Sequence, residues 1–118
     1  VRNFMNYDNR IFRGKTNSDN GEVSESTRFH YHQSGDQIWA EYSGGDVVKG
    51  HLQGKILSDG SLDFLYHHEN VRGELMAGRC RSVPDQSVEG KTILKESWKW
   101  FTGDQSEGVS EIEEVSDS

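Results

Sequence analysis

Turn-forming sequences recur at intervals of roughly ten to twelve residues along this chain, and the stretches between them alternate apolar and polar side chains. Alternation with a period of two is typical of β-strands that bury one face. Loop length fixes which residues of two joined strands lie opposite each other, so the turns test whether successive strands share that face. Turns predicted at Gly35–Asp36, Gly44–Asp46, Ser58–Gly60 and Val71–Gly73 all keep one aromatic face, which favours a continuous antiparallel sheet.

The first predicted strands cover Arg10–Lys15, Glu22–Gln33 and Gln37–Ser43, and Val1–Asn9 is predicted to be a loose lead-in. The turn lengths predict these cross-strand pairs: Tyr31 with Ala40, Tyr42 with Val48, Gly54 with Phe64, Tyr66 with Gly78, Trp98 with Ser110 and Glu96 with Ile112. Every pair joins two residues of the aromatic face. The sequence therefore predicts that one surface of the sheet collects most of the large side chains.

About eight strands result, and such a sheet has two exposed edges unless its last strand pairs with its first. The predicted fold is all-β, an antiparallel up-and-down barrel of about eight strands and of the lipocalin-like or calycin-like kind. A β-sandwich is the alternative. The barrel is expected to form a single domain over residues 1–115, with residues 116–118 as a disordered acidic tail.

Charge and cysteine content bound the possible partners. The formal net charge is −7, and the sequence has no clustered stripe of lysine and arginine. Binding to nucleic acid or to an anionic membrane surface is therefore not expected. Cys80 is the only cysteine, which excludes an internal disulfide, and no apolar run is long enough for a signal sequence or a membrane span. The expected location is cytoplasmic.

The segment Thr92–Phe101, TILKESWKWF, concentrates the most promising chemistry. Read as a strand, it puts Glu96, Trp98 and Trp100 on one face. If that face is the inside of the barrel, the Glu96 carboxylate lies among aromatic rings. Desolvation then raises its pKa, unless Arg10 or a tyrosine hydroxyl reaches the carboxylate.

The predicted interior combines aromatic side chains with small residues. Small residues such as Gly50, Gly54 and Gly78 are expected to leave room for a ligand among the rings. The predicted ligand-binding residues are Tyr31, Tyr42, Tyr66, Glu96, Trp98 and Trp100. The alternative is a packed barrel in which the tyrosines and Glu96 hydrogen-bond one another.

Histidines and the cysteine are weaker candidates. His30 and His32 share one strand face, and His51 is predicted opposite His67, but a zinc site needs three or four ligands. Only His68 is predicted to point inward, so no metal site and no cofactor are expected. Cys80 is predicted to be an inert core residue, and no catalytic residues can be assigned.

Much of the chain resembles a family of short, mostly bacterial β-rich proteins. The resemblance covers residues 6–114 and is carried by HYHQSGDQIWAEYSGGD (His30–Asp46), GELMAGRC (Gly73–Cys80) and KESWKWFTGDQSEGVSEIEE (Lys95–Glu114). Members are often labelled N-acetylglutamate synthases or similar acetyltransferases, which implies acetyl transfer to glutamate. The chain lacks the Arg/Gln-x-x-Gly-x-Gly/Ala turn that holds the acetyl-CoA pyrophosphate in acetyltransferases of the usual kind.

Three functions follow from these observations. The leading one is a barrel that binds a small molecule of unknown identity, and the first alternative is an N-acetyltransferase that acts on glutamate. The second alternative is a structural or protein-interaction module, in which the outward-facing Trp39, Leu65 and Phe101 or a free strand edge would form a homodimer.

Overall fold

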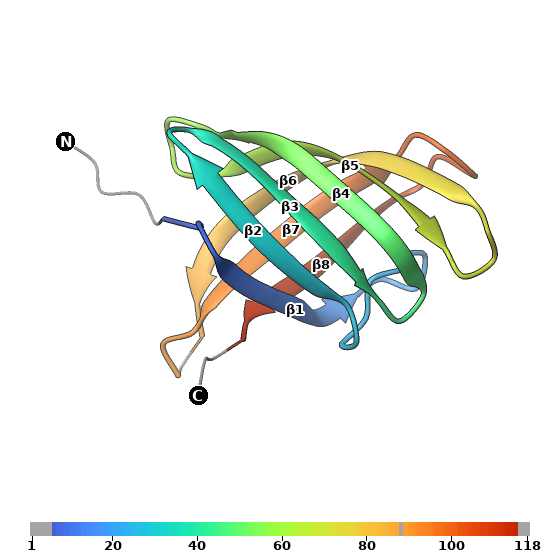
Figure 1. The fold of residues 1–118 in the computed structure, drawn as a ribbon, viewed down its shortest axis with the longest axis horizontal. Coiled ribbons are helices and arrows are strands. Elements are labelled where there is room, and N and C mark those ends of the chain that lie inside the picture. The colour runs from blue at the N-terminus through green and yellow to red at the C-terminus, as the bar shows by residue number, and fades with distance from the viewer. Residues whose placement is uncertain (1–5, 88, 116–118) are drawn as a thin grey trace.

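Eight antiparallel strands form a closed barrel in the computed structural model, which describes residues 6–87 and 89–115 (Figure 1). The strands are β1 (Arg10–Asn17), β2 (Arg28–Ser34), β3 (Gln37–Gly44), β4 (Val47–Ile56), β5 (Leu62–Asn70), β6 (Leu75–Gln86), β7 (Thr92–Trp100) and β8 (Glu107–Glu114). Each strand pairs with the next in sequence, and β8 pairs with β1. The predicted up-and-down barrel is therefore confirmed, and the sandwich alternative is wrong.

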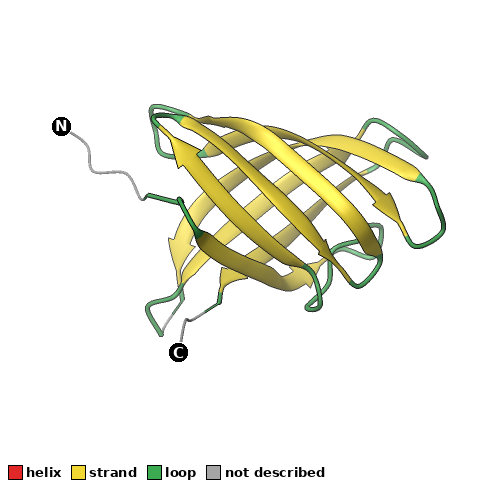
Figure 2. Cartoon of the chain, viewed as in Figure 1, coloured by secondary structure: helices red, strands yellow, loops and turns green. Residues whose placement is uncertain are grey.

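The described residues form strands and loops only (Figure 2). None of them forms a helix long and apolar enough to cross a membrane. The acidic tail predicted at residues 116–118 and the first part of the lead-in, residues 1–5, lie outside the described residues.

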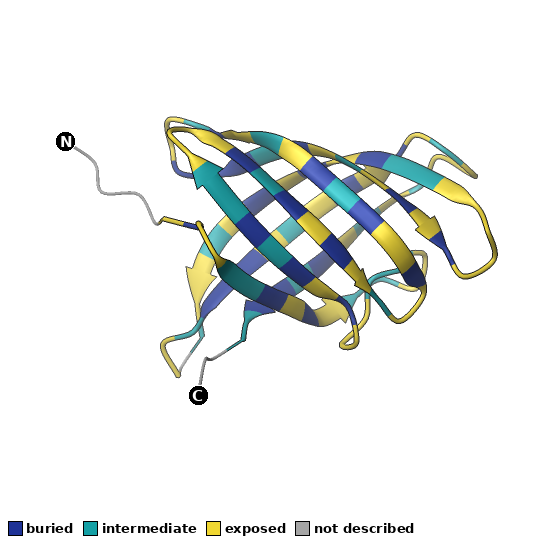
Figure 3. Cartoon of the chain, viewed as in Figure 1, coloured by how far each residue is buried: buried dark blue, intermediate teal, exposed yellow. Residues whose placement is uncertain are grey.

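Buried and exposed residues alternate along the strands (Figure 3). Residues that point into the barrel, such as Phe12, Tyr31 and Leu94, have almost no exposed surface. The period of two in the sequence thus identified the inner face correctly for these strands, with Val48 of β4 as an exception. Leu65 and Phe101 lie on the outside and are exposed, while Trp39 is partly covered. A homodimer through these three positions stays a prediction.

Three predicted cross-strand pairs are confirmed: Tyr31 with Ala40, Gly54 with Phe64, and Tyr66 with Gly78. The closure of the last strand on the first is confirmed as well. The pairing of Tyr42 with Val48 is wrong. A bulge in β4 places Gly50 opposite Tyr42, so that Val47 is buried at 2% exposure and Val48 is 51% exposed. A bulge adds one residue to one strand, and turn length alone does not reveal it.

The turn between β7 and β8 is also longer than predicted. Glu96 pairs with Ser110 and Trp98 with Gly108, which is a shift of two residues from the predicted pairs. Because a shift of two preserves the face, Glu96 and Ser110 still point inward. The error therefore changes the neighbours of Glu96 and leaves its orientation intact.

Both ends of the barrel differ from the prediction in a way that matters for the interior. The second strand begins at Arg28, not at Glu22, and residues 18–27 form a loop across one end that we call the cap loop. At the other end Tyr7, predicted to lie in a loose lead-in, is buried at 1% exposure and packs against Phe12 and Tyr31. An aromatic ring therefore plugs the end opposite the cap loop.

Four aromatic side chains on the inner face lie directly opposite a glycine of the neighbouring strand. The pairs are Tyr42 with Gly50, Phe64 with Gly54, Tyr66 with Gly78, and Trp98 with Gly108. A Cβ atom added to Gly50, Gly78 or Gly108 would collide with the side chain of its aromatic partner, and one added to Gly54 would collide with the backbone of β5. The glycines therefore accommodate the rings. The prediction that Gly50, Gly54 and Gly78 leave room for a ligand is wrong at these positions.

Gly54 tests this packing. A Cβ atom in Gly54→Ala would overlap the carbonyl oxygen of Asp63 and the Cα atom of Phe64, which the paired backbone cannot move away. We expect the substitution to lower the free energy of unfolding by about 1–3 kcal/mol in urea denaturation. Val48→Ala, on the exposed side of the same strand, should change it by no more than about 0.5 kcal/mol. Equal effects of the two substitutions would contradict the packing role.

Candidate ligand-binding site

A cavity of about 50 Å³ lies inside the barrel, beneath the cap loop. Its wall is mostly apolar and aromatic. The residues that form it come from the cap loop and from all eight strands, so no single hairpin could form it. The lining residues are Asn17, Gly21, Glu22, Val23, Phe29, Tyr42, Leu52, Phe64, Tyr66, His68, Cys80, Glu96, Trp98, Trp100 and Ser110. About 10–15 Å³ suffices for one water molecule, so the cavity has room for a few. The interior is neither completely filled nor widely hollow.

Glu96 on β7 is the carboxyl group of the cavity wall. The hydroxyl of Ser82 donates a hydrogen bond to one carboxylate oxygen at 2.8 Å, and that of Ser110 donates to the other at 3.2 Å. Trp98 supports Ser110 through a bond from its indole N–H at 3.2 Å. Arg10, considered above as a partner, pairs instead with Glu114.

Burial governs the ionisation of Glu96. Its side chain borders the cavity and keeps only a minor exposed fraction, so most of it is removed from water. Loss of hydration raises the pKa of Glu96 to about 7, although the hydrogen bonds from Ser82 and Ser110 oppose the rise. The pKa of Glu96 is thus raised, as predicted from the sequence, and loss of hydration is the predicted cause. A carboxyl group with such a pKa can donate or accept a hydrogen bond near neutral pH.

A second polar cluster joins the cap loop to the barrel. Glu22 accepts hydrogen bonds from His68 at 2.7 Å, from Asn70 at 3.0 Å and from Arg72 at 2.6 Å. The other ring nitrogen of His68, Nδ1, lies 2.9 Å from the hydroxyl of Tyr42. Because a carboxylate only accepts hydrogen bonds, Nε2 of His68 carries the proton, and in the neutral ring Nδ1 accepts from Tyr42. The cluster thus links cap loop, cavity wall and β5.

Tyr66 contributes a hydroxyl that is buried without a partner. Among the described residues, no group hydrogen-bonds to it. Its ring packs edge-on against Trp100 with centroids 5.5 Å apart, and burial raises the pKa of the phenol well above its ordinary value. Buried polar atoms without partners are uncommon in folded proteins, and each marks a position where a hydrogen-bonding group would be stabilised.

Five of the six predicted site residues line the cavity: Tyr42, Tyr66, Glu96, Trp98 and Trp100. Tyr31 does not. Its ring lies at the plugged end, against Phe12 at 5.2 Å and Tyr7 at 6.0 Å. The ligand-binding role of the six residues stays a prediction.

Sequence reasoning missed Glu22, Ser82 and Ser110 as site residues. Glu22 was assigned to a strand because Asn17–Gly21 resembles a tight turn, although the turn continues to Thr27. Ser82 and Ser110 could have been found, since both continue the inward-facing alternation of their strands. Ser110 was predicted on the inner face, opposite Trp98, but neither serine was predicted as a site residue, because an isolated serine on an apolar face carries no signal of its own.

Cys80 is buried next to Ser82 and Glu96. Burial, with the nearby carboxyl group of Glu96, raises the pKa of its thiol well above the ordinary value. A thiol of this kind is a poor nucleophile, because the thiolate is the reactive form. The geometry therefore agrees with an inert core residue.

The pKa of Glu96 predicts how stability depends on pH. The folded protein keeps the proton up to about pH 7, whereas the unfolded chain releases it near the ordinary value of 4.5. The stability that this proton contributes is therefore complete below pH 4.5 and is lost as the pH rises through 7. Between pH 5 and pH 7.5 the wild type should lose about 2 kcal/mol in urea denaturation.

Glu96→Gln should abolish this loss, because the amide keeps the shape and has no proton to release. Glu69→Gln is the matched control, because Glu69 is an exposed carboxyl group on the outside of β5. This variant should lose stability between pH 5 and pH 7.5 as the wild type does. If Glu96→Gln retained the full loss of stability, the assignment would be contradicted.

The comparison with known families corrects the resemblance described above. The family model of the avidin-like proteins matches residues 5–115. No curated protein matches the chain, and neither does any solved structure. The resemblance to N-acetylglutamate synthases is wrong, because the family that covers nearly the whole sequence is a β-barrel family, and the acetyltransferase alternative has no support. A closed barrel of eight antiparallel strands fits that family's calycin-type architecture, and the chain belongs to the avidin-like family.

Proposed function

We propose that the protein binds a small organic molecule in the cavity beneath the cap loop. The observation that carries this proposal is the buried Tyr66 hydroxyl without a protein partner, in an apolar cavity that also presents the Glu96 carboxyl group. Apolar walls with a few convergent polar groups are typical of small-molecule sites. Membership of the avidin-like family supports the same function.

The cavity wall limits the chemistry of the ligand. Its ionisable side chains include Glu22, His68 and Glu96, and the described lining residues contain no lysine or arginine. An anionic group placed deep in the cavity would therefore lack a cationic partner and would be disfavoured. The buried part of the ligand should be neutral and should carry N–H or O–H donors for Glu96 and an acceptor for Tyr66.

The size of the cavity limits how the ligand enters. A volume of about 50 Å³ is too small for a typical metabolite, so side chains or the cap loop must shift on binding. The cap loop lies outside the strands, so it can move without breaking the pairing of the barrel. The hydrogen bonds that hold it to the neighbouring turns and to His68 involve side chains. Rearrangement of this loop would enlarge the cavity at the end that the loop covers.

A thermal-shift screen tests the proposal. A biotin-like compound should be tried first, because the family description suggests it and because its ring portion is neutral with N–H donors and a carbonyl acceptor. A ligand present at one hundred times its dissociation constant adds about 2.7 kcal/mol to the free energy of unfolding. If no compound in a broad metabolite set raised the melting temperature, the proposal would fail.

Two matched tyrosine variants locate the site. Tyr66→Phe removes a hydroxyl that has no protein partner, so the stability of the free protein should be unchanged or higher. Binding should weaken by roughly three- to tenfold, the equivalent of one neutral hydrogen bond. Tyr7→Phe makes the same chemical change to a second unpaired hydroxyl that does not line the cavity, and affinity should not change. Equal affinities of the two variants, measured by calorimetry, would place the ligand elsewhere.

A further inference from the structure

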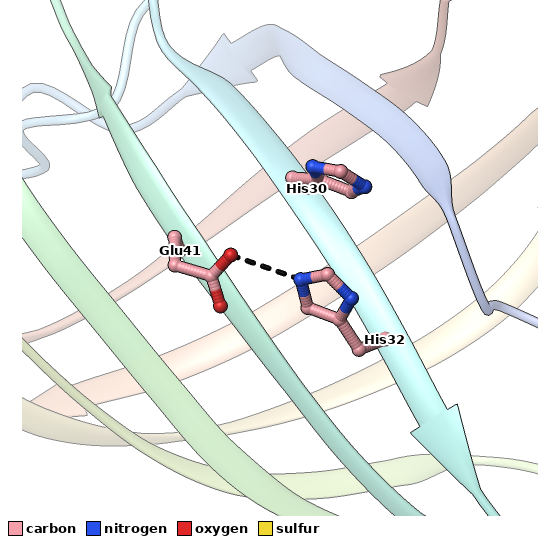
Figure 4. Close-up of side chains that lie close together, drawn as sticks. All are labelled: His30, His32 and Glu41. Atoms are coloured by element: carbon pink, nitrogen blue, oxygen red, sulfur yellow. Dashed lines mark hydrogen bonds and ion pairs between the residues drawn. The ribbon is translucent and has the colours of Figure 1, made fainter.

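Three side chains with metal-binding groups meet on the outer surface of β2 and β3, away from the cavity (Figure 4). His30 and His32 are alternate residues of β2 and so point to the same side, and Glu41 of β3 lies directly opposite His30. One ligand atom from each side chain lies within 4.8 Å of the others. The sequence supplied only the two histidines, because the third ligand comes from the neighbouring strand.

The distances suit a transition-metal ion with small adjustments. Zinc binds imidazole nitrogen and carboxylate oxygen at 2.0–2.2 Å, so neighbouring ligands of a tetrahedral ion lie about 3.3 Å apart. His32 Nε2 and a carboxylate oxygen of Glu41 are already 2.9 Å apart. The two imidazole rings stack with centroids 4.6 Å apart. Glu41 is 59% exposed in its side chain and can rotate, so bringing all three atoms to such spacing needs no movement of the barrel.

Neighbouring side chains hold both rings in place, as second-shell groups do around zinc. Asn9 Oδ1 lies 3.3 Å from His30 Nε2 and accepts a hydrogen bond from its N–H, which leaves Nδ1 of His30 as the unprotonated ligand atom. Trp39 stacks on the ring of His32 with centroids 5.6 Å apart and an angle of 23°. Both contacts reduce the conformational freedom that the rings would lose on binding a metal.

Charge also favours a cation at this place. The chain carries a formal net charge of −7. Within residues 6–87 and 89–115, the carboxylate of Glu41 forms its ion pair with His32 and none with a lysine or arginine. Several other surface carboxylates, including Asp63 and Asp85, are neutralised by Arg79 and Lys95. Glu41 therefore has its negative charge free for a metal that replaces the proton of His32.

We propose that His30, His32 and Glu41 bind one zinc ion on the outer face of the barrel. Two imidazoles and a carboxylate supply three ligands, and water occupies the fourth position because the site is open to solvent. Imidazole also binds nickel and copper well, so these ions serve as spectroscopic probes of the same site. The site is separate from the cavity and does not depend on the proposed ligand.

Calorimetric titration with zinc chloride at neutral pH tests the proposal on protein without an affinity tag. The wild type should bind one zinc ion, and His30→Asn and His32→Asn should each weaken binding by about tenfold or more. His67→Asn is the matched control: it removes an outward histidine two strands away that neighbours His51 and not the site. All three variants should keep the wild-type melting temperature in the absence of metal, since the altered rings lie on the outer face.

Tryptophan fluorescence gives a second test, because it reports where on the barrel the metal binds and not only how tightly. Copper or nickel bound to His32 lies close to the ring of Trp39 and should quench its emission, and Trp39→Phe should remove most of that quenching. The proposal is overturned if the wild type binds no zinc. It is also overturned if His67→Asn weakens zinc binding as much as His32→Asn, or if Trp39→Phe leaves the quenching unchanged.

Discussion

The pairing of aromatic rings with glycines across strands is the constraint on which the interior of this barrel depends. An eight-stranded barrel has an interior just wide enough for side chains, so large residues facing one another from every strand would not fit. Setting Tyr42 above Gly50 and Tyr66 above Gly78 lets each ring lie over the backbone of its neighbour. Large and small positions alternate around the wall as a result.

This packing also determines where the cavity lies. Rings laid against glycines line the wall and leave a small space in the middle, while Tyr7, Phe12 and Tyr31 fill the end behind them. Glu96 borders that space because its strand partners are Ser82 and Ser110, which are too short to cover it. The hydroxyls of those serines satisfy the carboxyl group without rehydrating it. Its raised pKa is therefore a product of side-chain size on the two adjacent strands.

The sequence sufficed for the barrel and for its inner face, because both depend on a period of two that survives errors in register. The incorrect pairing of Glu96 with Ile112 changed neighbours and not orientation, whereas the bulge in β4 turned Val48 outward and Val47 inward. Predictions that depend on neighbours were less successful. A glycine on an inner face looks the same in a sequence whether a ligand or a tyrosine ring lies over it. The role of Glu22 was hidden too, since its partners are more than forty residues away.

The cap loop has a consequence for rates. It is attached to each of the three turns at its end of the barrel, through Thr27 to Gly44, through Glu22 to Arg72 and through Asn20 to Glu107. Several hydrogen bonds must break together before the loop can lift, and Tyr7 closes the other end. A ligand bound as proposed above could leave through this end only when the loop opens as a unit. Its residence time is then set by the frequency of that opening, and faster diffusion or a higher ligand concentration outside cannot shorten it.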